Sequence, residues 1–201
     1  MVSFYISYIV LWAVVAVLFA AVFLLYRQCG ALLFRDSSVR FQQGPETDHK
    51  LAPLYARDVQ GLPVELGEGT GRFQFIFFAS SKCPICKEAI PSLQRFAATN
   101  ETLTETVMIC RGSENDVMSL SKTLVPALKV VHDSKGSIGR RSRIGTTPFA
   151  LLIDCGGVVR AKGAPVSDRE FAWFANRIVE GSATQGADTR IRVPRRSNHA
   201  G

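Results

Sequence analysis

The clearest capacity for chemistry lies in two cysteines separated by two residues, in the run Cys83-Pro84-Ile85-Cys86. The apolar run Phe73–Ala79 precedes them and a helical pattern follows, so Cys83 is expected at the N-terminus of a helix. The partial positive charge and unpaired N–H groups at that end stabilise a thiolate. Pro84 suits the first helical turn because its missing N–H has no intrahelical partner to lose.

This spacing predicts thiol–disulfide exchange. The two intervening residues place Cys86 at the same end of the helix, close enough to form a small disulfide with Cys83. Cys83 would react with a substrate sulfur, and Cys86 would resolve the mixed disulfide. The Cys83–Cys86 pair is then the redox group itself, and no cofactor or metal is expected. Lys82 and Lys87 either support the thiolate or are surface charge.

Other uses of paired cysteines fit less well. Zinc needs two further ligands, and His49, His132 and His199 are scattered along the chain. Haem attachment needs a histidine where Lys87 stands. A thiol peroxidase would use Ser80 and Cys83 as a Ser-x-x-Cys signature, although no proline precedes it in the strand. A binding or chaperone module that makes no use of its thiols is the non-enzymatic alternative.

The elements that must position the cysteines form an α/β pattern. Strands alternate with helices, which favours a parallel core, and a closing hairpin adds an antiparallel edge, so a central mixed sheet is expected. Ser167 and Glu170 form a capping box for the last helix. The expected elements are a hairpin over 54–66, strands at 73–79 and 106–110, helices from 84 and 113, an antiparallel pair over 149–162 and the helix from 167.

The first 26 residues contain no charged side chain, and 24 of them are apolar. A helix of that length reaches about 39 Å, which exceeds a hydrocarbon core of about 30 Å. No basic residue precedes the run and no cleavage motif follows it, so a membrane anchor is favoured over a removable signal. A second long apolar run is missing, which excludes a multi-span transporter.

Charge and composition divide the chain into four parts: an anchor over 1–26, a linker over 27–50, a domain over 51–180 and a tail over 181–201. The formal net charge of +7 is spread across the last three. The domain holds too little of it to indicate nucleic-acid binding. The tail is basic and is expected to be disordered.

The region from about 44 to 180 resembles the thioredoxin superfamily, and in particular its membrane-anchored branch. The shared features are the strand–CxxC–helix unit, Pro91 eight positions after Cys83, and Thr147-Pro148 before a strand. The resemblance implies a thioredoxin-like fold with Cys83 as nucleophile and Cys86 as resolving thiol. It also implies that Pro148 is a cis-proline facing them, and that Thr147 offers backbone groups to a substrate strand.

Within that branch the run 77–87, with Pro91 and one N-terminal span, is similar to proteins of methylamine utilisation. This implies a partner protein whose disulfides are formed or maintained, namely the small subunit of periplasmic methylamine dehydrogenase, together with a redox partner protein. Arg27, Arg35 and Arg40 follow the span and argue for a cytoplasmic domain by the positive-inside rule. The periplasm is nevertheless expected, since a CxxC oxidase works outside the reducing cytosol.

One position departs from the pattern of the superfamily. Many thioredoxins have a buried acid six residues before the first cysteine, where this chain has Phe77, so the route by which Cys86 loses its proton is open. The remaining cysteines are expected to be passive: Cys110 is expected to be buried in a strand and Cys155 to be exposed in a turn. A bridge between two copies through Cys29 is a weaker hypothesis.

Overall fold

The computed structural model of the 201-residue chain describes residues 6–23, 43–67 and 71–189, with side chains described up to residue 182. It forms two compact units, Met1–Gln42 and Gln43–Gly201. In the first unit, Ile6–Phe23 is a charge-free helix with a mean hydropathy of 2.6, long and apolar enough to cross a membrane. An anchor and a signal sequence both fit this helix.

The second unit is built on a five-stranded mixed sheet with the order β5-β4-β3-β6-β7. The central strand β3 runs parallel to β4 and antiparallel to β6, and β4 is also parallel to β5. The strands are β3 (Phe73–Ser80), β4 (Thr104–Arg111), β5 (Leu128–His132), β6 (Phe149–Ile153) and β7 (Val159–Gly163). The predicted α/β fold with a central mixed sheet is therefore confirmed.

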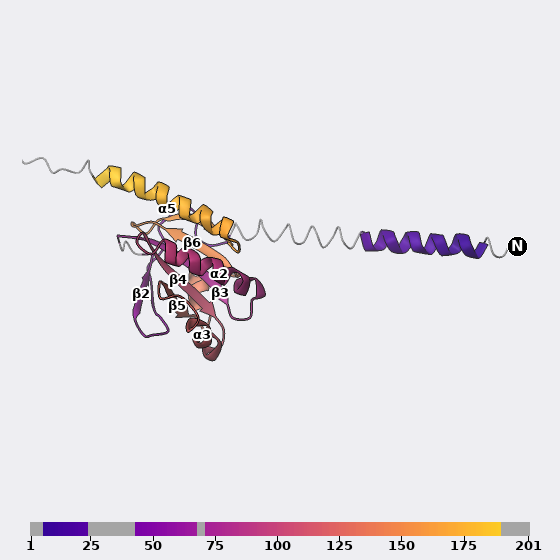
Figure 1. Ribbon diagram of the computed structural model, residues 1–201, viewed down its shortest axis with the longest axis horizontal. Helices are drawn as coiled ribbons and strands as arrows, with labels where there is room; N and C mark the ends of the chain where they lie inside the picture. Colours follow the sequence, from indigo (N-terminus) through magenta and orange to yellow (C-terminus); the bar gives the residue numbers. More distant parts are fainter. Residues whose placement is uncertain (1–5, 24–42, 68–70, 190–201) are drawn as a thin grey trace, which may run out of the picture. The chain divides into compact units, whose positions relative to one another are not determined.

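Helices α2 (Pro84–Thr99), α3 (Glu114–Ser121) and α5 (Asp168–Thr189) pack on one face of this sheet. Figure 1 shows α5 lying alongside α2 over the strands. The contact is aromatic, because the ring of Phe75 in β3 lies 4.5 Å from that of Phe96 in α2. The same ring lies 5.1 Å from Phe174 in α5. These contacts bury the strand that leads to Cys83.

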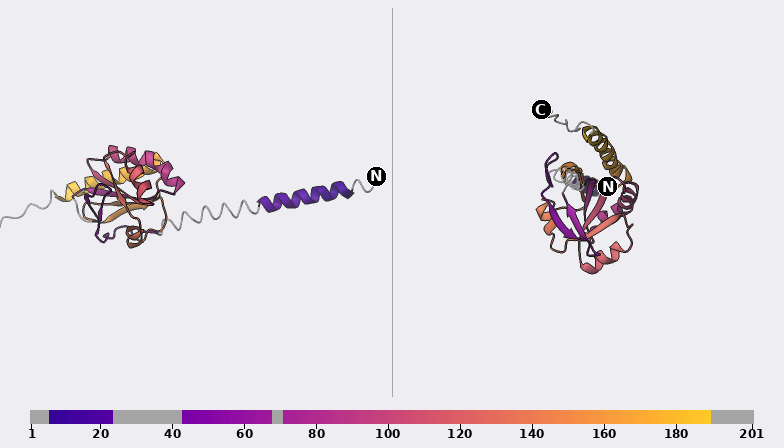
Figure 2. Two further views of the ribbon diagram at one scale, coloured as in Figure 1. Left: turned by 90° about the horizontal axis from the view of Figure 1, so that it is seen from below. Right: turned by 90° about the vertical axis from the view of Figure 1, so that its left-hand side faces the viewer.

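The opposite face of the sheet is covered by a smaller hairpin and a short helix. The hairpin consists of β1 (Leu54–Arg57) and β2 (Pro63–Leu66), which pair antiparallel, and the helix is α4 (Ser137–Arg141). Buried Leu54, Val64 and Leu66 contribute to the core on this face. The two views in Figure 2 show helices on one side of the sheet and the hairpin on the other. β3 is thus covered on both faces, as its continuous apolar run predicts.

The region between α3 and β6 contains two elements that are missing from the elements expected from the sequence. β5 is a short edge strand, and α4 has only five residues with Gly136 as its N-cap in the left-handed region. Neither has the length or the periodicity that a pattern search detects. At the other end, α5 continues to Thr189, beyond the expected domain end at 180, while residues 190–201 lie outside the described ones.

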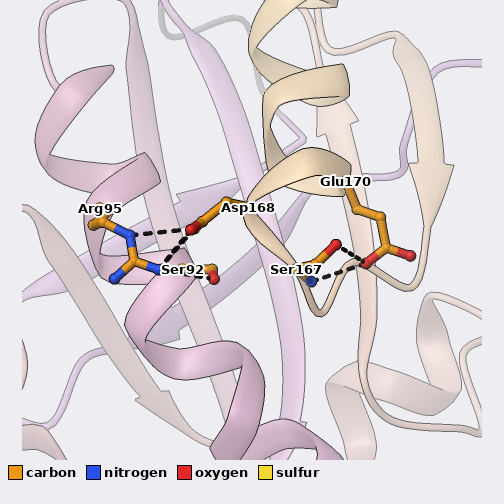
Figure 3. A network of polar contacts seen from close by, with 5 residues as sticks. All are labelled: Ser92, Arg95, Ser167, Asp168 and Glu170. Carbon is orange, nitrogen blue, oxygen red and sulfur yellow. Dashed lines mark hydrogen bonds and ion pairs between the residues drawn. The ribbon is translucent and has the colours of Figure 1, made fainter.

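The capping box of α5 forms as the sequence predicts (Figure 3). The Glu170 carboxylate accepts hydrogen bonds from the Ser167 amide and hydroxyl, each at 2.9 Å, and from the Val166 amide. Next to it, the Asp168 carboxylate accepts hydrogen bonds from the Arg95 guanidinium of α2 at 2.8 Å. Partial burial alone would raise the pKa of Glu170, but these hydrogen bonds outweigh it and lower the pKa.

We expect Glu170→Ala to reduce the free energy of unfolding by about 1 kcal/mol at pH 7, because a helix cap is lost. A carboxyl whose pKa is lowered by folding stabilises the fold when the pH is above its pKa in the unfolded chain, about 4.3. This stabilisation is lost as the pH falls through the pKa of the carboxyl in the folded protein. The difference between wild type and variant should therefore shrink below about pH 4. Urea unfolding of the full chain in detergent, followed by circular dichroism, measures it. The exposed neighbour Arg169→Ala is the control, and a pH-independent difference would contradict the expectation.

Candidate active site

The two cysteines lie where β3 passes into α2. Cys83 is the N-cap of α2 with an extended backbone, and Pro84 is in the first turn. The Cys86 amide donates a hydrogen bond to Cys83 Sγ at 3.2 Å, so this sulfur accepts one of the free N–H groups at the helix start. Upstream, the Cys83 amide donates to the Ser80 carbonyl at 3.1 Å, which fixes the turn out of β3. The predicted placement of Cys83 is therefore found.

The two thiols differ in accessibility. Cys83 is half-buried, whereas Cys86 is only 1% exposed; both are free thiols. Burial, assisted by the neighbouring Cys83 side chain, raises the pKa of Cys86 to about 12. Cys86 is therefore a protonated thiol at neutral pH. A macromolecular partner can reach only the sulfur of Cys83 directly, which fits a division into an attacking and a resolving cysteine.

The loop before β6 meets both cysteines. The Thr147–Pro148 peptide bond is cis. Cys83 Sγ donates to the Thr147 carbonyl at 3.7 Å, and the Thr147 side chain acts to lower the pKa of Cys86 against the larger effect of burial. The fold thus brings together four of the residues singled out in the sequence, although 60 residues separate Cys86 from the loop. Pro84 and Lys87 are exposed at the start of α2, and the Lys87 side chain has no hydrogen bond or ion pair to another described residue.

A residue that the sequence analysis assigns to the linker supports this loop. The Gln43 side-chain carbonyl accepts from the Gly145 amide at 3.2 Å and from the Thr146 amide and hydroxyl at 3.1 and 3.0 Å. Its backbone carbonyl accepts from Lys162 of β7 at 3.1 Å. The compact unit begins at this residue, eight positions before the expected start at Leu51. No local pattern marks Gln43, because its partners lie about 100 residues away.

The position occupied by a buried acid in many thioredoxins is here fully apolar. Phe77 is completely buried, and its ring lies 6.0 Å from that of Phe171 in α5. Glu88, the nearest carboxylate along the chain, is exposed on α2. The polar side chains that act on Cys86 are those of Cys83 and Thr147. The side-chain groups that influence the pKa of Cys86 are therefore a hydroxyl and a second sulfur.

The other cysteines lie apart from this pair. Cys110 is fully buried in β4, as expected, and burial raises its pKa to about 11. Cys155, expected to be exposed, is half-buried in the turn between β6 and β7. The hypothesis about Cys29 falls outside the described residues. Among the described residues, no group of three histidine, cysteine or acidic side chains could hold a metal ion.

Solved structures define the class of fold. A Chlorobium tepidum protein described as a thiol:disulfide interchange protein DsbE matches with a TM-score of 0.60 at 20% identity, covering 67% of this chain and 96% of that one. A secreted Mycobacterium tuberculosis disulfide oxidoreductase matches with a TM-score of 0.52 at 21% identity, covering 63% and 95%. The chain thus has the thioredoxin-like fold that these proteins share, with a CxxC pair at the start of α2.

The sequence of the chain is similar to those of proteins named methylamine utilization protein MauD. The MauD of Methylophilus methylotrophus is 26% identical over 185 residues, covering 89% of this chain and 85% of that protein. The MauD of Paracoccus denitrificans is 28% identical over 163 residues, covering 78% and 80%. No family model matches the chain. The similarity to MauD extends over most of both chains.

The unequal burial of the two thiols predicts selective alkylation. After reduction, iodoacetamide at pH 8 should modify Cys83 at least tenfold faster than Cys86, since a thiol with a pKa of about 12 is almost entirely protonated there. Peptide mass mapping over a time course gives both rates. The comparison is cleanest with Cys29, Cys110 and Cys155 replaced by serine. Equal rates for the two sites would show that Cys86 is not shielded as described.

Proposed function

We propose that the protein is a membrane-tethered thiol–disulfide oxidoreductase that acts on a partner protein. The observation that carries the proposal is the pairing of an accessible Cys83 at the N-terminus of α2 with a shielded Cys86, both against Thr147. Cys83 and Cys86 are the proposed catalytic residues. Thr147 and Pro148 would bind an extended segment of the substrate, and Pro84 and Lys87 would support the helix start.

The proposed reaction is a two-step exchange. In the reducing direction, the Cys83 thiolate attacks one sulfur of a substrate disulfide, that S–S bond breaks, and the departing substrate sulfur takes up a proton. Cys86 then attacks Cys83 Sγ, which forms the Cys83–Cys86 disulfide and releases the second substrate sulfur. The proton of Cys86 passes to that leaving sulfur. The substrate gains two electrons and the cysteine pair loses two; the oxidising direction is the reverse.

The pKa of Cys86 bears on the second step. A thiol with a pKa of about 12 is a poor nucleophile until its proton moves, and the buried ring of Phe77 offers no base. The Thr147 side chain acts to lower the pKa of Cys86 and would therefore favour its thiolate as the proton departs. Thr147 would therefore serve both steps, since its carbonyl faces Cys83 and its side chain acts on Cys86.

The similarity to MauD supports a more specific substrate. We propose that the partner is the small subunit of methylamine dehydrogenase, whose disulfides this protein would form, isomerise or maintain during maturation. A separate redox partner protein would return the cysteine pair to its starting state, because each exchange leaves it oxidised or reduced. The helix Ile6–Phe23 would hold the domain at the membrane, with the domain in the periplasm.

Trapping tests the two cysteine roles. Cys86→Ser should accumulate a mixed disulfide between Cys83 and the partner, because the resolving thiol is gone, whereas Cys83→Ser should lose exchange by at least a hundredfold. Non-reducing gels and mass spectrometry of cells producing each variant measure this. Cys110→Ser is the matched control and should trap nothing. Full function of a Cys83→Ala/Cys86→Ala variant would instead support the binding or chaperone role. Rapid consumption of hydrogen peroxide by the wild type would support the peroxidase role.

Reporter fusions test the orientation of the domain. Alkaline phosphatase joined after Gly201 should be active and green fluorescent protein at the same place should be dark, because phosphatase needs the oxidising side for its disulfides. Fusions of the same two reporters after Phe23, at the end of the hydrophobic helix, serve as the control for expression. A fluorescent, phosphatase-negative result would place the domain in the cytoplasm, as the arginines after the span suggest.

A further inference from the structure

Five exposed cations surround the short helix α4. Arg111 ends β4, Lys135 precedes the helix, Arg140 and Arg141 close it, and Arg143 follows it. We call these five residues the α4 cation cluster. They are contiguous in the fold, because the Arg111 guanidinium lies against Gly136 and the Arg140 guanidinium donates to the Lys135 carbonyl at 2.6 Å.

No ion pair between described residues neutralises the side chains of this cluster, whereas Arg95, Lys129 and Arg160 each pair with a carboxylate. The one acid within the segment, Asp133, is 5% exposed. Its two oxygens are occupied by the amides of residues 137, 138 and 139 at 2.7 to 3.2 Å. The buried carboxylate thus caps α4 and leaves the outer cations to the solvent.

Three other carboxylates lie near the edges of the cluster. Glu46 shares a hollow with Arg141 and Arg143 and lies 3.8 Å from the His49 ring. Asp116 in α3 accepts from the Ser81 hydroxyl. Asp58 accepts the amides of its own turn. Hydrogen bonds to neutral groups leave these carboxylates charged, but none of them forms an ion pair with the five cations, which remain exposed to solvent.

The cluster adjoins the proposed active site. The Arg111 carbonyl accepts from the Ser81 amide at 2.8 Å, two residues before Cys83. A hollow lined by Arg111, Gly139 and Thr147, among others, connects α4 with the loop that faces the two cysteines. Arg111 is the cation that lines this hollow together with Thr147. A substrate segment that lies across Thr147 and Pro148 and continues past Arg111 would therefore meet the rest of the cluster around α4.

We propose that the α4 cation cluster is a docking surface for an acidic segment of the substrate protein, next to the cysteine that Cys83 engages. Arginine suits this role because its planar guanidinium binds carboxylates with two hydrogen bonds. An acidic segment is drawn toward the cluster from solution, which raises the rate of encounter. This inference rests on the proposed function and adds to it the class of sequence that the site prefers.

Two disulfide-bearing peptides test the inference: they differ only in three residues beside one cysteine, three aspartates in one and three serines in the other. The rate of mixed-disulfide formation with full-length Cys86→Ser protein in detergent, followed by mass spectrometry, is the readout. At low salt we expect the acidic peptide to react about tenfold faster than the neutral one. Sodium chloride at about 0.5 M should reduce this advantage to about twofold because the charges are screened.

In the same background, Arg140→Gln/Arg141→Gln should remove most of the advantage while the neutral peptide reacts as before. The matched control is Lys122→Gln/Arg169→Gln, which removes the same charge from α3 and α5 on the other face of the sheet and should leave the advantage intact. The ratio of the two rates within each variant cancels any general loss of activity. Equal rates for both peptides, or a ratio unchanged by the α4 substitutions, would overturn the inference. Failure of both peptides to react at all would instead contradict the proposed function.

Discussion

The hydrogen bond from the Cys86 amide to the Cys83 sulfur is the interaction on which the site depends. It exists because α2 begins at Pro84 and leaves its first amides without helical partners. That starting point is in turn fixed by β3, which is held between two neighbouring strands and covered on both faces. Packing of aromatic rings about Phe75 therefore helps to determine where the Cys83 sulfur lies, although none of those rings is part of the proposed site.

The two cysteines at the start of α2 differ in burial. Burial keeps Cys86 protonated and hidden, while the N-cap position leaves Cys83 accessible. Phe77 is a buried apolar residue of the same core cluster as Cys86, and the loop that ends in Pro148 supplies a polar contact to Cys83. Strand order brings that loop to the cysteines, because β6 lies beside β3 and runs in the opposite direction. The start of β6 therefore faces the end of β3.

Much of this arrangement follows from local sequence signals. The apolar run of β3, the Cys-Pro-x-Cys start of α2 and the capping box at Ser167 each reflect an interaction between near neighbours, and a pattern reveals those. β5 and α4 are too short for periodicity to mark them. The contacts of Gln43 and the gathering of cations around α4 depend on residues far apart in the chain, so only the folded structure brings them into view.

The support that Gln43 gives to residues 145 and 146 ties the site to the stretch of chain leading from the hydrophobic helix. If a cut just before Leu51, where composition changes, separates the domain from the preceding chain, the loop loses its acceptor. The Lys162 ammonium of β7 likewise loses the carbonyls of residues 43 and 45. A fragment that retains the native geometry around Thr147 must therefore include Gln43, and shorter fragments would show less of the proposed exchange activity than the intact protein.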